Sequence, residues 1–193
     1  MHSPPFSADS AGVVLSSLSG NAVHAVIQVT KDMQPVVFSR WTVPLSLGVE
    51  PGVADLTLEQ LLRIGKERKL MLDMTQRRLM SAAEWAALLD TCLIPLSDLL
   101  QMLPSELGIS LELAYASPAL CNLFQLNRCH DLNAFVDSVL SSVYSALSSP
   151  DEARKTGKRR KLVFSSFSPD VCAALNWKQP NCKSYILTNL ISF

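Results

Sequence analysis

The chain has 193 residues, of which 48% are hydrophobic and 18% are charged. This balance is typical of one globular domain with a sizeable core, and it excludes a disordered chain. The 17 Lys and Arg residues balance 17 Asp and Glu residues. No net charge therefore favours nucleic acid or an anionic membrane as a partner, and any function must lie in a local site.

The cysteine content and the lack of long apolar runs bear on the compartment. No apolar run approaches the roughly 20 residues that cross a bilayer, and the N-terminus lacks a secretory pattern, so we expect a soluble chain with no membrane span. The five cysteines are odd in number and include no Cys-x-x-Cys pair. We therefore expect reduced thiols and an intracellular protein, cytoplasmic or nuclear. The basic run Lys158–Lys161 fits either a nuclear localisation signal or a solvated turn.

The expected elements alternate between strands and helices. Residues 1–11 are predicted to be a flexible leader, and residues 12–193 a single partial domain. Thr57 and Ser81 are expected N-caps, and Glu84 completes a capping box with Ser81. The order favours parallel strands joined by right-handed crossovers. In chain order we predict strands at 12–15, 22–29, 35–38, 108–114 and 161–165, and helices at 57–66, 82–89, 95–102, 132–147 and 169–175.

Five blocks of sequence share the order of motifs in a known family. They are Thr30, Asp32 and Pro35–Phe38; Asp55–Leu61; Ile94–Leu100; Leu111–Tyr115; and Phe164–Pro169. This series resembles the glycerophosphodiester phosphodiesterase (GP-PDE) domain family. The residues of these blocks are most similar to the divergent C-terminal domain of fungal phosphate-pathway regulators. Those regulators are cyclin-dependent kinase inhibitors with SPX and ankyrin regions upstream.

The resemblance implies an α/β fold, namely a TIM-barrel-like (β/α) parallel barrel with its functional groups at the C-terminal ends of the strands. Such a barrel takes about 250 residues. After Lys178–Asn181 the sequence departs from the family pattern within a short tail. We therefore expect the barrel to be incomplete at its C-terminal end.

The resemblance also implies a divalent ion, Mg²⁺ or Ca²⁺, held by several carboxylates. When the family pattern is aligned on Thr30 and Asp32, its Glu-x-Asp metal pair falls on His24 and Val26. Glu112 is the one retained ligand-type position and is our metal-ligand candidate. A buried carboxylate paired with a nearby cation is the alternative role for Glu112.

The proton-transfer groups that the resemblance implies are also replaced. The family's His-Asp pair falls on Ser39 and Arg40, and its later Lys falls on Ala114. The family's first-strand histidine has no counterpart in residues 1–23. Because two histidines act as acid and base in the family's reaction, we expect that reaction to be lost. The catalytic and substrate-binding residues remain unassigned.

We therefore predict a phosphodiesterase-like domain, related to phosphoric diester hydrolases of glycerophosphodiester and lipid metabolism, that is catalytically degenerate and regulatory in phosphate signalling. Its partner would be a protein of a phosphate-responsive kinase pathway. One alternative is an active metal-dependent hydrolase with replacement ligands from Asp32, Asp55 or Glu50. The other is an inactive fragment of a larger or truncated protein.

Overall fold

The computed structural model describes residues 22–45, 50–71, 80–147 and 160–187. The leader predicted at residues 1–11 and the strand predicted at 12–15 lie outside the described residues. Within the described ranges, none of the helices combines the length and the apolar character that spanning a bilayer requires.

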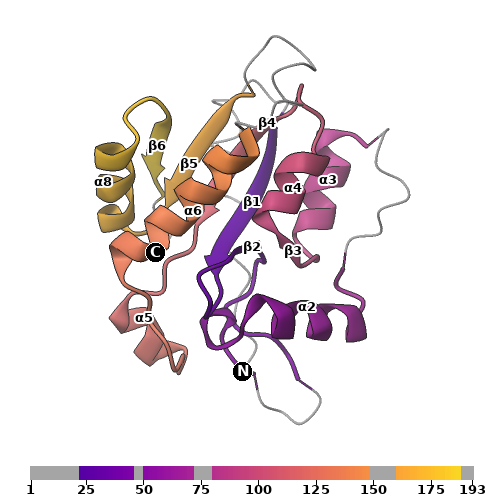
Figure 1. Cartoon of the computed structure of the whole chain (residues 1–193), viewed down its shortest axis with the longest axis vertical. Helices are drawn as coiled ribbons and strands as arrows, with labels where there is room; N and C mark the ends of the chain where they lie inside the picture. Colours follow the sequence, from indigo (N-terminus) through magenta and orange to yellow (C-terminus); the bar gives the residue numbers. More distant parts are fainter. Residues whose placement is uncertain (1–21, 46–49, 72–79, 148–159, 188–193) are drawn as a thin grey trace, which may run out of the picture.

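A six-stranded sheet forms the centre of the molecule, with strand order β3-β2-β1-β4-β5-β6 (Figure 1). The strands β1, β4, β5 and β6 pair in parallel, whereas β2 pairs antiparallel with β1 and with β3. In the described part of the chain this sheet is open and does not close into a barrel. The predicted α/β architecture with a mostly parallel sheet is confirmed. The strands are β1 Ala22–Val29, β2 Pro35–Val37, β3 Ile94–Pro95, β4 Gly108–Leu113, β5 Leu162–Ser166 and β6 Lys183–Ile186.

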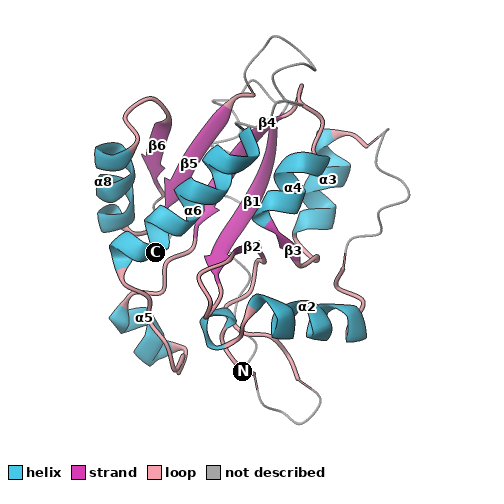
Figure 2. Cartoon of the chain, in the orientation of Figure 1, coloured by secondary structure: helices cyan, strands magenta, loops and turns pink. Residues whose placement is uncertain are grey.

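Four helices cover one face of the sheet, as the secondary-structure colouring makes clear (Figure 2). They are α3 Ala82–Leu89, α4 Leu96–Met102, α6 Leu132–Leu147 and α8 Pro169–Lys178. The helices α2 Leu58–Glu67 and α5 Pro118–Leu123 lie instead toward the end at which β1 finishes (Figure 1). A short 3-10 turn, η1 Val53–Asp55, precedes α2.

Local signals in the sequence explain where the helices begin. The Thr57 hydroxyl accepts a hydrogen bond from the Gln60 amide, and Ser81 does the same for Glu84. Both are capping boxes, which satisfy backbone N–H groups that have no partner inside the helix. The predicted caps are confirmed. The sequence did not predict α5 or β6, because α5 is a single short helix and the β6 segment, Lys-Ser-Tyr-Ile, lacks a clear apolar pattern.

The two faces of the sheet differ in chemistry because successive side chains of a strand point to opposite sides. Val23, Ala25 and Ile27 of β1 pack in the main core with Trp85, which has no exposed surface. The opposite face carries polar side chains from β1, β4 and β5, and it holds the candidate site.

One residue of the basic run before β5, Arg160, has a structural role. Arg160 donates hydrogen bonds from Nη1 to the Leu100 carbonyl at 3.1 Å and from Nη2 to the Leu103 carbonyl at 2.8 Å. A cation at the end of a helix satisfies its last carbonyls and opposes the helix dipole. Arg160 thus ties the loop before β5 to the end of α4.

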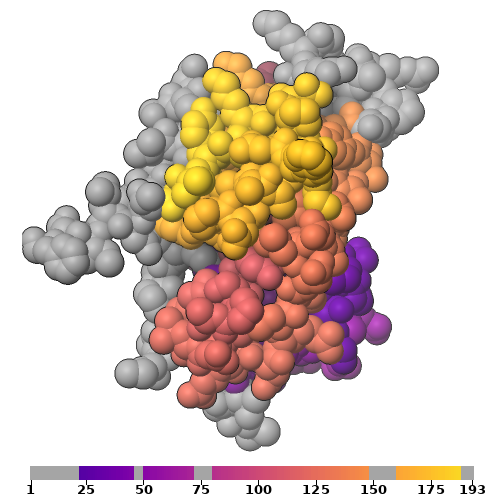
Figure 3. Space-filling view, turned by 90° about the vertical axis from the view of Figure 1, so that its left-hand side faces the viewer, coloured from indigo at the N-terminus to yellow at the C-terminus, as the bar shows by residue number. Residues whose placement is uncertain are grey.

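The last described elements form one side of the molecule. There α8 and β6, drawn in yellow, lie above the segment that contains α5 (Figure 3). Trp177 on α8 is 89% exposed, whereas Trp85 and Trp41 are buried.

Candidate functional site

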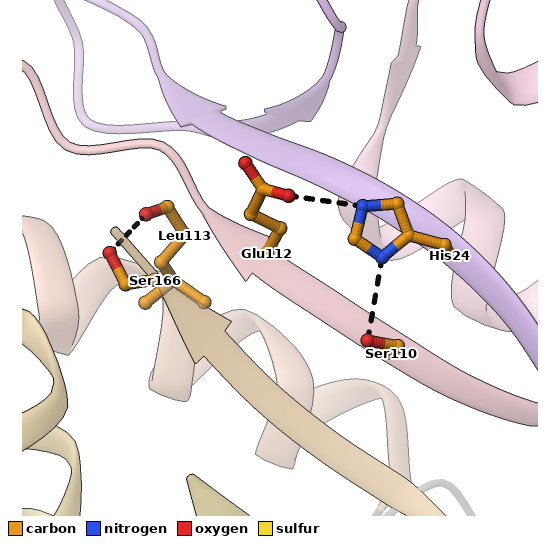
Figure 4. Close-up of polar contacts among 5 residues, drawn as sticks. All are labelled: His24, Ser110, Glu112, Leu113 and Ser166. Carbon is orange, nitrogen blue, oxygen red and sulfur yellow. Dashed lines mark hydrogen bonds and ion pairs between the residues drawn. The ribbon is translucent and has the colours of Figure 1, made fainter. Parts of the chain in front are cut away.

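The polar face of the sheet brings together an imidazole, a carboxylate and a hydroxyl. His24 Nε2 lies 3.1 Å from Glu112 Oε2, and His24 Nδ1 lies 3.4 Å from Ser110 Oγ. In Figure 4 the His24 side chain reaches from β1 across to the two β4 residues. His24 pairs in register with Ser110, and Val26 pairs with Glu112, so the imidazole reaches its carboxylate diagonally.

Glu112 is the most deeply buried ionisable group of this site. The residue is 1% exposed, and its second oxygen, Oε1, is buried without a hydrogen-bond partner among the described residues. Ser165 of β5 is the register partner of Glu112, and its Oγ is likewise buried and unpartnered. A buried carboxylate needs compensating donors, and from the part of the chain that the structure describes, His24 is the one side-chain donor to Glu112.

The residues at this position do not fit the divalent ion that the family resemblance implies. Mg²⁺ and Ca²⁺ need several oxygen ligands, usually with more than one carboxylate. Among the described residues, Glu112 is the lone carboxylate at this position, Val26 is apolar, and His24 Nε2 is hydrogen-bonded to Oε2 of that carboxylate. Among the described residues no group of three or more His, Cys, Asp or Glu side chains is arranged to hold a metal ion.

The replacement ligands considered from the sequence do not gather at Glu112. Asp32 Oδ1 accepts hydrogen bonds from the Thr30 hydroxyl at 2.6 Å and from the Leu58 amide at 2.9 Å, and so joins the β1–β2 turn to α2. Partial burial would raise the pKa of Asp32, but these hydrogen bonds outweigh it and lower the pKa. Asp55 accepts from the Gly52 amide, and Glu50 accepts from the Thr42 hydroxyl.

The two positions that follow β2 also have structural roles. Ser39 is buried, and its hydroxyl donates to the Asp90 carbonyl at 2.7 Å. Arg40 is exposed, and its carbonyl accepts a hydrogen bond from the Gln28 side chain at 2.7 Å. Among the described residues, neither the Ser39 nor the Arg40 side chain forms a hydrogen bond or ion pair with Glu112.

A small cavity lies where β1 and β4 end, at the rim where α/β folds of this kind carry their functional groups. Its lining includes Gln28, Trp41, Ala114, Arg128 and His130. The cavity measures about 20 Å³, which is room for about one water molecule. As the described residues line it, this cavity is too small for a glycerophosphodiester.

His130 is held at the edge of that cavity by the end of β1. Its Nε2 donates to the Val29 carbonyl at 3.0 Å. Burial lowers the pKa of His130, and the nearby Arg128 charge adds to this, while the hydrogen bond to Val29 opposes it. Sequence analysis did not single out this histidine as a site residue, because no local pattern marks it.

Two cysteines close a loop beside the cavity. The structure joins Cys121 and Cys129 in a disulfide, with 6.5 Å between their Cα atoms. The prediction of five reduced thiols is therefore wrong for this pair, because the turn after α5 returns the chain to Cys121, whose carbonyl accepts from the Leu126 amide. The other three are free thiols, and burial raises the pKa of Cys92 to about 11.

Comparison with known proteins places this geometry in a family context. Residues 26–192 match the model of the glycerophosphoryl diester phosphodiesterase family. The chain is 30% identical over 179 residues to the ankyrin repeat protein nuc-2 of Neurospora crassa, with 91% of the chain and 17% of that protein covered. It is 27% identical over 221 residues to the glycerophosphocholine phosphodiesterase GDE1 of Candida albicans, with 91% of the chain and 18% of that protein covered.

Two further comparisons extend this picture. The chain is 24% identical over 176 residues to the phosphate system positive regulatory protein PHO81 of Saccharomyces cerevisiae, with 88% of the chain and 14% of that protein covered. The chain thus spans less than a fifth of each of these relatives. A crystal structure of an assigned glycerophosphoryl diester phosphodiesterase from Silicibacter pomeroyi DSS-3 has a TM-score of 0.56 at 17% identity, covering 92% of this chain and 59% of that one. That likeness concerns the fold.

Proposed function

Because the chain belongs to the glycerophosphoryl diester phosphodiesterase family, we propose that it is a regulatory module of phosphate signalling that keeps the fold of these enzymes without their hydrolytic reaction. The observation that carries this proposal is the contact between His24 Nε2 and Glu112 Oε2. It occupies the one carboxylate that the family resemblance offers to a metal ion.

The positions of the described histidines support the loss of hydrolysis. Acid–base cleavage of a phosphodiester needs two proton-transfer groups that flank the same phosphorus. His24 lies near the start of β1, whereas His130 binds the carbonyl of Val29 at its end. Five residues of extended strand separate those two points, which is about 16 Å. One small substrate cannot contact both imidazoles at once.

The relatives support a role in regulation. One is named an ankyrin repeat protein and another a positive regulatory protein of the phosphate system, although a third is a glycerophosphocholine phosphodiesterase. His24 and Val26 stand where the family resemblance implies the carboxylate pair of a metal site. The proposed partner is therefore a protein of a phosphate-responsive kinase pathway, and the proposed compartment is the cytoplasm or the nucleus.

Hydrolysis is the direct test of the catalytic part. We expect no release of choline or glycerol 3-phosphate from glycerophosphocholine above the blank, with Mg²⁺ or with Ca²⁺, when circular dichroism shows the chain to be folded. The Candida albicans GDE1 protein, assayed alongside, is the positive control. Turnover that depends on the metal and is abolished by Glu112→Gln would refute the proposal.

Exchange of the domain tests the regulatory part. The matching segment of PHO81 would be replaced by this chain, and a phosphate-starvation reporter would be measured in yeast. We expect the wild-type chain and the Glu112→Gln variant to support the same response, because the proposed role needs no metal. A chimera with the segment deleted is the control. A response no stronger than that of the deletion would contradict the regulatory role.

A further inference from the structure

We infer that His24 is an internal substitute for the cation that the family resemblance implies, in that its imidazole N–H holds the Glu112 carboxylate that would otherwise serve as a metal ligand. The inference rests on the proposed function, since it explains how the fold was kept after the metal was lost. The observation behind it is a contact of 3.1 Å between side chains that lie 88 residues apart.

The register of the sheet places the relevant positions together. Val26 lies directly beside Glu112 on β4, and His24 lies beside Ser110 one step earlier along both strands. All four side chains face the same side of the sheet, since they alternate with the core residues of β1 and β4. Carboxylates at positions 24 and 26 would therefore converge on Glu112.

Both ring nitrogens of His24 have a hydrogen-bond partner without a metal ion. An imidazole that carries its proton on Nε2 donates to Glu112 Oε2, and its Nδ1 then accepts from the Ser110 hydroxyl. Ser110 has no exposed surface, so its hydroxyl gains a partner in the same arrangement. The substitution at His24 thus satisfies two buried polar groups of β4 with one side chain.

Two buried oxygen atoms of the site could still serve as metal ligands. Glu112 Oε1 and Ser165 Oγ are buried neighbours that have no hydrogen-bond partner within the described ranges, and both are oxygen atoms of the type that bind hard cations. The imidazole covers one oxygen of Glu112 and leaves the other. We expect that carboxylates placed on β1 at positions 24 and 26 would complete a cation site with these oxygens.

Rebuilding that shell is the first experiment. The full chain with His24→Glu and Val26→Asp would be titrated with Ca²⁺ by calorimetry, beside the wild-type chain and a matched control with His24→Gln and Val26→Asn. We expect the carboxylate variant to bind with a Kd on the order of 10⁻⁴ to 10⁻³ M. Binding should be at least about ten-fold tighter than in the other two, and Glu112→Gln added to the variant should remove it.

The second experiment uses the wild-type chain, so that a failure of the carboxylate variant to fold does not decide the matter. A ¹⁵N–¹H correlation spectrum of the histidine side chains reports which ring nitrogen carries the proton. We expect His24 to be in the Nε2–H form, with a resonance that is unchanged by 10-fold excess Ca²⁺ and shifted by Glu112→Gln. A spectrum showing averaged tautomers that ignore Glu112→Gln would overturn the inference.

The outcomes separate the inference from the proposed function. A folded carboxylate variant that binds Ca²⁺ no better than its amide control would overturn the internal substitute and leave the regulatory proposal standing. Saturable Ca²⁺ binding by the wild-type chain through Glu112 would also overturn it. Hydrolysis of glycerophosphocholine by the wild-type chain is the result that would refute the proposed function itself.

Discussion

Replacement of His24 by Leu should destabilise the chain, because it removes the side-chain donor that the buried Glu112 carboxylate depends on. Glu112 is 1% exposed, and one of its oxygens already lacks a partner. Loss of a hydrogen bond to a charged group, with the group left buried, costs about 2 to 3 kcal/mol. This cost lies at or below the about 3 kcal/mol at which the range for broken buried ion pairs begins, since the His24 side chain is 16% exposed and admits some water.

Urea unfolding followed by circular dichroism measures this loss. With a slope of about 2 kcal/mol per M, the midpoint should fall by about 1 M. The paired variant His24→Leu with Glu112→Leu should recover most of that loss, because apolar side chains can replace a buried pair at little cost. Glu112→Gln is the isosteric control, since its amide oxygen still accepts from His24.

Two results would refute the reasoning about His24. A midpoint for His24→Leu within about 0.2 M of the wild-type value would mean that Glu112 does not depend on the imidazole. A paired variant that is as unstable as the sum of its two single variants would mean that the side chains are not coupled. Either result would also weaken the account of how the fold survives without a metal.

Three other predictions concern parts of the chain outside this pair. Burial lowers the pKa of His130, so its pKa is lower in the folded chain than in the unfolded chain. The stability that neutral His130 contributes is therefore complete above the unfolded-state pKa and is lost as the pH falls from there toward the folded-state pKa. His130→Gln should accordingly flatten the fall in urea midpoint between pH 7.5 and pH 5. Asp32→Ala removes the acceptor of the Leu58 amide and should lower the free energy of unfolding by about 1 kcal/mol, while an unchanged midpoint would argue against this cap. Alkylation of the denatured, unreduced chain should label three cysteines, and five labelled thiols would contradict the pairing of Cys121 with Cys129. Joint replacement of these two cysteines by Ser should lower the free energy of unfolding by about 2.5 kcal/mol.

The sequence was sufficient for the elements whose signals are local. Thr57 and Ser81 begin their helices as predicted, because a cap depends on residues three positions apart. The apolar run Ala22–Val29 is β1 with the predicted bounds. The family blocks could likewise be recognised from residue order, and the family model confirms them. That His24 and Val26 stand where the family has a carboxylate pair stays a prediction.

Contacts between distant segments were decided by the tertiary structure alone. The pairing of His24 with Glu112 depends on the register between β1 and β4, which backbone hydrogen bonds set across 88 residues of sequence. A shift of one residue would turn Glu112 into the apolar core. The joining of Cys121 to Cys129 spans a sequence separation of 8 and depends instead on the local turn after α5. By itself the sequence determined which chemical groups this protein carries, whereas only the folded sheet decided which of them meet, because side-chain partners are chosen by strand register and burial.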